Sequence, residues 1–248
     1  VVDGYSDGDF RPDDVLTRGA AAKIICNLIL GPTTASALAA STAPFKDVPV
    51  TNTFAGYITY CSQQGIISGY ADGTFRPTGT LSGNAFMKML LGALGYDAEI
   101  EGYEGSNWSV AVAKQAMGIG LDDGNDKFVG TQAVTREEAC LYAFNTLTAD
   151  VVEYGSKTTV NINGATVVVG GNEATKVSNT AAASKHYNDE ADGVMQFCEQ
   201  YFKDLKLKSG ESQDEFGRPA KTWYNKTNKI GTYAKEADVV YTAKTKAE

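Results

Sequence analysis

Apolar residues in the first 150 positions recur with helical spacing in three segments that each follow a threonine or a serine. Their spacing is helical, as at residues 21, 24, 25 and 28, which are positions i, i+3, i+4 and i+7, and it predicts amphipathic helices with one buried face. The apolar stripes cover residues 21–28, 85–94 and 139–144. The hydroxyl residues that precede them are Thr17, Ser82 and Thr135. Such side chains cap the first amides of a helix, so we expect each helix to begin just after its hydroxyl residue.

A shorter helix is predicted ahead of the second and third of these helices. The two shorter helices cover residues 54–64 and 108–117. Their candidate N-caps are Asn52 or Thr53 for the first and Asn107 for the second. Each is expected to end at a glycine, Gly65 or Gly118. The pattern is therefore a pair of helices joined by a loop, and it occurs twice in full.

The loop between the helices carries an aspartate–glycine motif that occurs three times. The copies occupy residues 5–12, 70–77 and, in a weaker form, 123–128. In each copy a phenylalanine stands seven positions before the hydroxyl residue, while the copies start 65 and 53 residues apart. Fixed spacing inside a unit and variable spacing between units indicate a structural module. A module that cannot bury its own apolar face must share a core with its neighbours, which favours a binding scaffold over an enzyme.

These signals divide the chain into a partial repeat, a linker, two repeats and a final region. The boundaries are 1–30 for repeat 1, 31–44 for the linker, 45–97 for repeat 2, 98–148 for repeat 3 and 149–248 for the remainder. Repeat 1 lacks its first helix, so its apolar face needs cover from another segment or chain. The chain starts within a repeat and stops abruptly, so we expect it to be a fragment of a longer protein.

Beyond residue 149 the periodicity changes to that of a small α+β region. Residues 160–169 alternate around Asn163-Gly164, which favours a type I′ hairpin. A helical pattern runs through residues 189–207. The segments expected to add a second hairpin and a further strand are residues 221–224 with 230–233, and 239–241.

Composition and charge narrow the class of partner. The chain has 248 residues, is 43% hydrophobic and carries a net charge of −8. All of that excess lies in residues 1–150, where 9 basic residues stand against 17 acidic ones. An acidic surface disfavours nucleic acid, because phosphates require a basic stripe. No apolar run approaches the roughly 18 residues that cross a bilayer, so we expect no membrane span.

The residues that most often carry metal or catalytic chemistry lack suitable partners. The four cysteines, without metal-site spacing, are Cys26, Cys61, Cys140 and Cys198. The first three lie in apolar helical patterns, where a free thiol acts as a small hydrophobe, and a disulfide pair is the alternative. The aspartate–glycine loops favour turn-forming aspartates over calcium ligands. His186 has no partners for a triad or a zinc site, so we expect no catalytic residues, metal or cofactor.

Together these motifs resemble the S-layer homology (SLH) domain, the cell-wall anchoring module of many bacterial surface proteins. The resemblance spans residues 1–148 and rests on Phe-Lys-Asp-Val at 45–48, Gly-Ile-Ile-Ser-Gly-Tyr at 65–70, the Asp-Gly-x-Phe-x-Pro loop and the Thr-Arg-x-Glu helix start. It implies a mainly α fold in which three helix–loop–helix repeats, the first truncated, form a pseudo-threefold prism. It also implies an extracellular location at the bacterial cell wall. There, inter-repeat grooves bind secondary cell-wall polysaccharide, often carrying pyruvyl ketals.

The helix start of repeat 3 has the features that an acidic sugar requires. Thr135 and Glu138 form a capping box, which leaves Arg136 projecting from the helix N-terminus. Free amides and the helix dipole favour an anion at that point. A guanidinium can also hold a carboxylate through two hydrogen bonds. The alternative is that the box only starts the helix and Arg136 is solvated.

The other repeats depart from this helix start. Repeat 1 keeps Thr17 and Arg18 but has Ala20 in place of the glutamate, and repeat 2 has Ser-Gly at 82–83. The groove led by repeat 2 is therefore predicted to be degenerate. At most two sites, around Arg18 and Arg136, should be competent.

An aromatic residue and two lysines are further candidates for the site. Trp108 is either a platform for stacking on sugar or a core aromatic. Lys23 and Lys88 lie at equivalent helix positions and fit a solvated face better than a ligand role. The resemblance contributes three positions from the 45–48 and 65–70 motifs. The predicted carbohydrate-binding residues are Thr17, Arg18, Asp47, Gly69, Tyr70, Trp108, Thr135, Arg136 and Glu138.

The leading hypothesis is a non-enzymatic module that anchors a surface or S-layer protein to anionic wall polysaccharide. One alternative is a structural surface-assembly protein that acts through contacts with other surface-layer subunits. Another is the anchor part of a larger surface enzyme. Binding to cell-wall sacculi, before and after removal of polysaccharide, separates the first two hypotheses.

Overall fold

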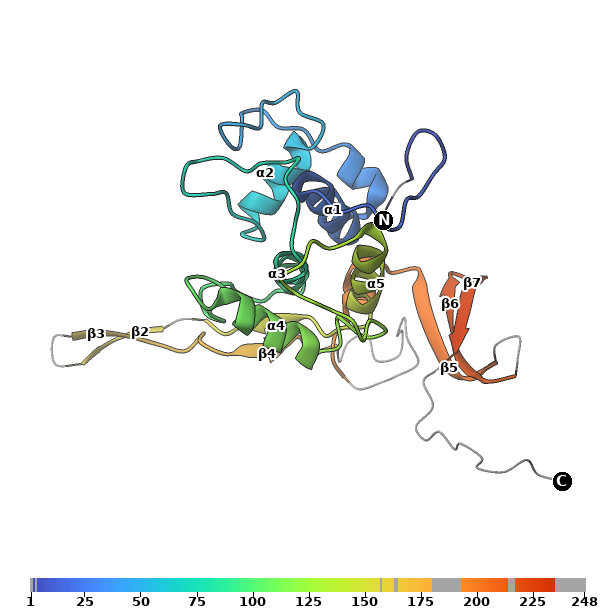
Figure 1. Ribbon diagram of the computed structural model, residues 1–248. Helices are drawn as coiled ribbons and strands as arrows, with labels where there is room; N and C mark the ends of the chain where they lie inside the picture. The colour runs from blue at the N-terminus through green and yellow to red at the C-terminus, as the bar shows by residue number, and fades with distance from the viewer. Residues whose placement is uncertain are drawn as a thin grey trace.

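The computed structural model describes residues 2, 4–156, 158–162, 165–179, 193–213 and 217–234. Its N-terminal part is helical, and small antiparallel sheets follow (Figure 1). The helices are α1 (Arg18–Ser36), α2 (Ala55–Gln63), α3 (Gly83–Ala93), α4 (Trp108–Gly118), α5 (Arg136–Thr146) and α6 (Phe197–Tyr201). The prediction of a helical region followed by a smaller region with strands is confirmed.

The second helix of each repeat begins where the sequence predicts, because a hydroxyl side chain occupies its N-cap. Thr17, Ser82 and Thr135 cap α1, α3 and α5, each accepting a hydrogen bond from the amide three residues later at 3.2–3.3 Å. At α5 the Glu138 carboxylate also accepts from the Thr135 amide, which completes the predicted capping box. Each cap satisfies an amide that has no partner within the helix.

The residues just before these caps join the three repeats through backbone hydrogen bonds. The Leu16 amide donates to Val134, the Val134 amide to Leu81, and the Leu81 amide to Leu16, at 2.8, 2.9 and 3.2 Å between nitrogen and oxygen. These bonds close a ring in which every repeat is bonded to the other two. All three side chains are buried, as expected where modules share one core.

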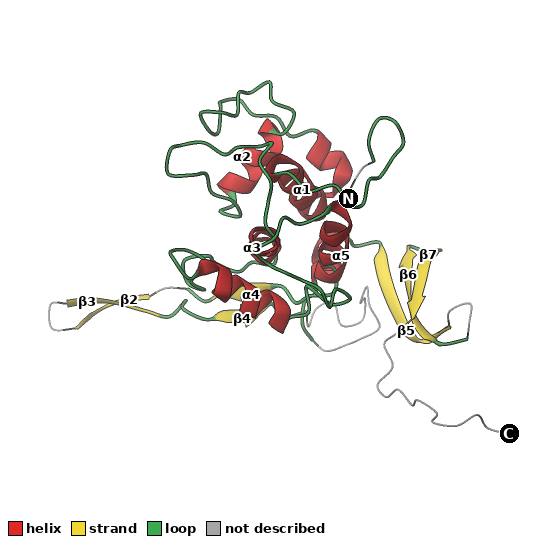
Figure 2. Ribbon diagram, in the orientation of Figure 1, coloured by secondary structure: helices red, strands yellow, loops and turns green. Residues whose placement is uncertain are grey.

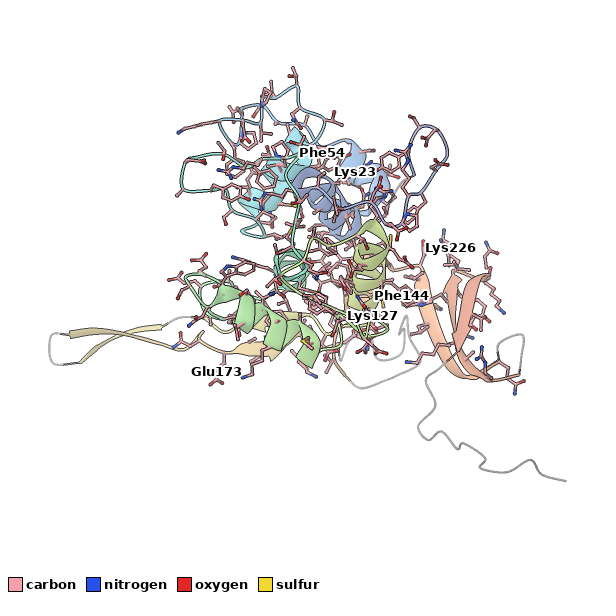
Figure 3. All side chains as sticks on the ribbon, viewed as in Figure 1. Lys23, Phe54, Lys127, Phe144, Glu173 and Lys226 are labelled. Carbon is pink, nitrogen blue, oxygen red and sulfur yellow. The ribbon has the colours of Figure 1, made fainter. Side chains whose placement is uncertain are left out.

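The first helix of each complete repeat packs on the second helix of the repeat before it. α2 lies against α1, and α4 lies against α3 (Figure 1). Glycine permits the close approach at the start of α1, where a Cβ atom at Gly19 would meet the ring of Phe54 at 2.6 Å (Phe54 is labelled in Figure 3). Buried side chains from α1 to α5 and Phe197 of α6 form one continuous core.

Two helix ends differ from the prediction, and so does the start of α2, whose N-cap is Phe54 rather than Asn52 or Thr53. α1 continues beyond Gly31 into residues assigned to a linker, with a kink where Gly31 has a φ of 74°. Pro32 fits just after the kink, because a residue in the first turn of a helical segment needs no amide donor, and Ala35 is fully buried. At the other boundary Gly118 stays within α4, and Gly120 adopts the positive φ of 73° instead.

The strands form small antiparallel sheets, and the β2–β3 hairpin extends away from the helices (Figure 2). The described strands are β1 (Val152–Tyr154), β2 (Thr158–Ile162), β3 (Ala165–Val169), β4 (Ala174–Lys176), β5 (Leu205–Gln213), β6 (Pro219–Asn225) and β7 (Asn228–Ala234). β1 pairs with β4, β2 with β3, and β5, β6 and β7 form one sheet in that order. Both predicted hairpins are therefore confirmed.

The helix predicted over residues 189–207 is wrong over most of its described length. Only α6 is helical, Val194 lies in an isolated bridge, and β5 begins at Leu205. Leu207 is opposite Trp223 on β6 and is only 3% exposed. Pairing within the sheet therefore decides the conformation of a segment whose apolar residues fit either period.

Several predicted features cannot be placed. His186, the turn at Asn163-Gly164 and the candidate strand at 239–241 lie outside the described residues. Where the structure does describe the chain, no helix is both long enough and apolar enough to cross a bilayer.

Candidate functional site

A cavity of about 350 Å³ lies where the three repeats meet, and we refer to it as the Arg18 cavity. Its walls come from the start of α1, the loop after α2, the first half of α3 and the segment that leads into α4. This volume falls in the range of roughly 300–1,000 Å³ that is usual for small-molecule sites. The predicted site residues that line it are Arg18, Gly69, Tyr70 and Trp108.

Arg18 is fixed in the cavity wall by the loop of repeat 2. Its Nε donates to the Phe75 carbonyl at 2.7 Å and a terminal nitrogen donates to the Ser68 carbonyl at 3.2 Å. The guanidinium carbon lies 4.3 Å from the centre of the Phe75 ring and 4.9 Å from that of Tyr70. Burial lowers the pKa of Arg18, but a guanidinium stays charged in proteins. These two hydrogen bonds use two of its five N–H donors, so the group can also bind an anion.

Lys88 supplies a second cation to the same cavity. It is half-buried on α3, and its Nζ donates to the Tyr103 carbonyl at 2.7 Å. Burial lowers the pKa of Lys88, while the nearby carboxylate of Glu104 acts in the opposite direction. Glu104 also lines the cavity, so two cations stand there against one carboxylate. This balance favours an anionic ligand over a neutral one.

Aromatic rings and a glycine shape the rest of the wall. Trp108 begins α4 and Tyr70 begins the repeat 2 loop, so rings from two repeats face one cavity. Trp108 is also packed partly against the core, in line with the core interpretation, while its role as a platform for sugar stays a prediction. Gly69 is required by packing, because a Cβ atom there would overlap the Phe45 ring.

Asp47 does not line the cavity, but it binds the backbone of the repeat 2 loop. Its two carboxylate oxygens accept from the amides of Phe75 and Arg76, both at 2.7 Å. Desolvation acts to raise the pKa of Asp47, but these amide hydrogen bonds outweigh it and lower the pKa. Since the Phe75 carbonyl in turn binds Arg18, Asp47 positions the arginine through the loop.

The helix N-termini do not offer free amides, in contrast to the prediction. In α5 the amides of Arg136 and Glu137 donate to the carbonyls of Asp14 and Pro12 at 2.9 and 3.0 Å. The same arrangement occurs at α1 and α3, where the carbonyl oxygens come from Gly79 and Pro77, and from Gln132 and Gly130. The loop of the neighbouring repeat thus occupies the place of an anion. Thr17, Thr135 and Glu138 likewise act as caps in the structure.

Arg136 repeats the contacts of Arg18 but is more deeply buried. Its Nε donates to the Phe10 carbonyl at 2.9 Å, and its guanidinium carbon lies 4.7 Å from the Tyr5 ring centre and 4.9 Å from that of Phe10. The residue is 9% exposed, so it is neither solvated nor projecting. Its contacts with Phe10 and Tyr5 link repeat 3 to repeat 1.

The equivalent position in repeat 2 is filled by protein. A Cβ atom at Gly83 would meet Cε2 of Phe128 at 2.8 Å, so the phenylalanine ring occupies the space that an arginine would need. This packing supports the prediction that the groove led by repeat 2 is degenerate. It also explains why repeat 2 tolerates glycine at the start of α3, where the helix would otherwise favour another residue.

The aspartate–glycine loops form turns, as predicted. Gly8, Gly73 and Gly124 all have positive φ values of 81–91°, which glycine adopts without strain. Asp72 accepts from the Thr74 amide at 2.9 Å and pairs with Arg76 at 2.9 Å. Among the described residues no group of three metal-ligating side chains comes together.

Lys88 is the residue that sequence reasoning undervalued. Its exposed position in the helical pattern favoured solvation, whereas the structure places it against repeat 3. The available signal was its equivalence to Lys23 in repeat 1, since a cation repeated at one helix position suggests a shared role. Tyr103 and Glu104 had no motif that could have identified them.

Comparison with known proteins agrees with this architecture. The S-layer homology domain matches residues 1–22 and 44–84. The chain is 25% identical over 169 residues to the "Surface layer protein" of Brevibacillus choshinensis, which covers 68% of this chain and 15% of that protein. It is 40% identical over 74 residues to the "Cellulosome-anchoring protein" of Acetivibrio thermocellus, covering 30% of this chain and 16% of that protein.

A third relative, the "Cell surface glycoprotein 1" of Acetivibrio thermocellus, is 36% identical over 88 residues, 36% of this chain and 4% of that protein. The chain therefore spans less than a fifth of the length of these curated relatives. The matched family and these relatives are surface-layer and anchoring proteins rather than enzymes. The chain carries an S-layer homology domain, and its homologues are surface-layer and cell-wall proteins.

Proposed function

We propose that this chain anchors an extracellular bacterial surface protein to the cell wall by binding acidic secondary cell-wall polysaccharide in the Arg18 cavity. The observation that carries the proposal is the meeting of Arg18, Lys88 and Trp108 in one cavity formed by three repeats. Two cations suit a carboxylate, such as that of a pyruvyl ketal, and an indole suits the C–H face of a sugar. The repeats then form a pseudo-threefold prism around the ring of Leu16, Leu81 and Val134.

We assign the ligand to the Arg18 cavity. Arg136 and Gly83, at the equivalent positions of the other repeats, are assigned to packing between repeats. Arg136 is 9% exposed, and the Phe128 ring fills the space beside Gly83. Binding should therefore be dominated by one groove rather than by three. Thr17, Asp47, Thr135 and Glu138 support the repeats without contacting the sugar in this proposal.

Binding of the full chain to purified cell-wall sacculi tests the proposal. Intact sacculi should retain the protein, and sacculi stripped chemically of polysaccharide should not. Arg18→Ala should weaken binding about ten- to a hundredfold, because a charge-assisted hydrogen bond contributes about 1.5–3 kcal/mol. Arg11→Ala is the matched control, since Arg11 has the same charge and also belongs to repeat 1, but it pairs with Asp7 on an exposed loop and does not line the cavity. Undiminished binding to stripped sacculi would reject the proposal.

An assembly role is the second candidate, and one observation favours it. Because the Phe128 ring fills the space beside Gly83 and Arg136 is buried, two of the three equivalent positions are not assigned to sugar. Contacts with other surface-layer subunits would then be the main function of these surfaces. Retention on stripped sacculi only when other surface-layer protein is present would support this candidate. The relatives' greater length also leaves room for the chain to anchor a larger surface enzyme.

A further inference from the structure

Two buried thiols face each other across the contact between α1 and α2. The Sγ atoms of Cys26 and Cys61 are 3.5 Å apart, and both residues have an exposed fraction of 0%. Cys26 lies on the second helix of repeat 1, and Cys61 lies on the first helix of repeat 2. The pair therefore sits at an interface between repeats, and the proposed anchoring function makes no use of its chemistry.

Backbone contacts hold each thiol toward the opposite helix. The Cys26 sulfur donates to the Tyr57 carbonyl on α2 at 3.5 Å, and the Cys61 sulfur donates to the Ala22 carbonyl on α1 at 3.6 Å. A disulfide bond measures about 2.05 Å, so the sulfurs must approach by roughly 1.5 Å. Side-chain rotation on two packed helices can supply a movement of this size.

The other two cysteines are placed differently. Cys140 lies on α5 and is only partly buried. Cys198 lies on α6 in a separate apolar cluster with Leu207 and Trp223. The chain thus contains one close pair of thiols among its four cysteines, all of which are free in this structure.

We infer that Cys26 and Cys61 form an oxidative modification site, at which a disulfide ties repeat 1 to repeat 2. The oxidant is a small disulfide such as oxidised glutathione. One cysteine thiolate attacks it and releases one thiol, and the second cysteine then displaces the other thiol from the mixed disulfide. Two protein thiols are oxidised to one S–S bond, and one small disulfide is reduced to two thiols. An extracellular location, as proposed above, provides the oxidising conditions in which such bonds persist.

The environment of the pair determines when the bond forms. The hydrogen bond with Cys26, together with burial, raises the pKa of Cys61 above its ordinary value. Because the thiolate is the reacting form, exchange is slow once the helices have packed. We therefore expect the bond to form during folding, while both sulfurs are still accessible.

The cross-link would protect two parts of the anchor. It closes a loop of 35 residues that includes the exposed segment at Ser41, so a cut there would not separate the repeats. It also fixes Cys61, whose backbone carbonyl accepts hydrogen bonds from the amides of Ile66 and Ile67 at 2.9 and 3.4 Å. Both isoleucines line the Arg18 cavity. The disulfide therefore stabilises the segment that begins the cavity loop.

The test is to unfold the full chain with reductant and refold it either in a glutathione redox buffer or in reductant alone. After oxidative refolding, peptide mapping should show Cys26 joined to Cys61, with Cys140 and Cys198 still open to alkylation. The Tm of the oxidised protein should be higher by roughly 5–15 °C, as expected for a loop of this length in a chain of this size. A cut introduced at Ser41 should leave the fragments joined on a gel without reductant.

Three outcomes would overturn the inference: four alkylatable thiols after oxidative refolding, a disulfide that involves Cys140 or Cys198, or a Tm that does not rise on oxidation. In the double variant Cys26→Ala/Cys61→Ala the Tm should be independent of redox state, whereas Cys140→Ala should respond as the wild type does. If the double variant does not fold, the comparison of oxidised with reduced wild-type protein still tests the inference. Wall binding of the reduced protein, measured separately, distinguishes failure of the cross-link from failure of the anchoring proposal.

Discussion

The ring of Phe128 lies against the α-carbon of Gly83, so close that a methyl group added at position 83 would meet Cε2 at 2.8 Å. Repeats 1 and 3 have arginines at the equivalent position, and each donates to the carbonyl of the loop phenylalanine. The same interface between repeats is therefore packed in two ways. In repeats 1 and 3 an arginine lies over the ring of the loop phenylalanine. In repeat 2 the phenylalanine ring itself fills the space that an arginine side chain would need.

Gly83→Ala should destabilise the protein although alanine favours helix formation. The added methyl group must displace the Phe128 ring, and overpacking of this kind costs about 1–3 kcal/mol. The measurement is the free energy of unfolding in denaturant. Gly118→Ala is the control, because no atom lies within 4 Å of a Cβ at that position of α4. It should leave stability unchanged or raise it by up to about 1 kcal/mol. Equal gains for both variants would show that position 83 is not filled.

Arg136→Ala should reduce stability more than Arg18→Ala. Arg136 is 9% exposed, whereas Arg18 is half-buried beside a cavity. Loss of the Arg136 hydrogen bond to Phe10 leaves a carbonyl without its charged donor, which costs about 1.5–3 kcal/mol. Unfolding and sacculus binding should be measured on both variants. For sacculus binding we expect the opposite order, with the larger loss for Arg18→Ala. If Arg136→Ala had the larger effect in both assays, the assignment of Arg136 to structure and of Arg18 to binding would be contradicted.

Trp108 should report ligand binding through its fluorescence. The chain has two tryptophans, and Trp223→Phe leaves Trp108 as the single emitter. A pyruvylated wall fragment should change the emission of this variant in a saturable manner, because the ring lines the cavity. Trp108→Ala should weaken binding about tenfold, the equivalent of about 1.4 kcal/mol. Trp223→Phe should bind as the wild type does. An unchanged spectrum at saturating fragment would exclude Trp108 from the site.

Asp47 should contribute to acid sensitivity. Its pKa is lowered in the folded protein, so its contribution to stability is complete above the unfolded value of about 3.9. That contribution is lost as pH falls through the lower folded value. As the pH falls below about 4, the free energy of unfolding should therefore fall by more in the wild type than in Asp47→Asn. Asp13→Asn, at an exposed aspartate, should keep the wild-type profile. Parallel profiles for all three proteins would refute this role.

Local chemistry in the sequence predicted the helix starts well. Thr17, Ser82 and Thr135 each act within three residues, so neighbouring positions alone specify the cap. The repeated glycine of the loops is equally local, since a positive φ is a property of one residue. The predicted helix around Leu207 was wrong because its apolar residues fit both periods, and pairing with β6 decided between them.

The site was less predictable because its contacts join distant residues. The sequence identified Arg136, but not that Phe10, 126 positions away, receives its hydrogen bond. The amides at the helix starts were expected to be free because their partners belong to the next repeat. Lys88 was undervalued for the same reason, since Tyr103 lies across an interface that no pattern within α3 reveals.

The closed circle of backbone bonds among Leu16, Leu81 and Val134 has a mechanical consequence. In an open stack, the last unit has one neighbour and peels away when a single interface breaks. Here no unit is last, so each can leave only by breaking two interfaces together. Tension on the chain is then divided between the two interfaces, which would suit the load that the proposed anchoring role places on this region.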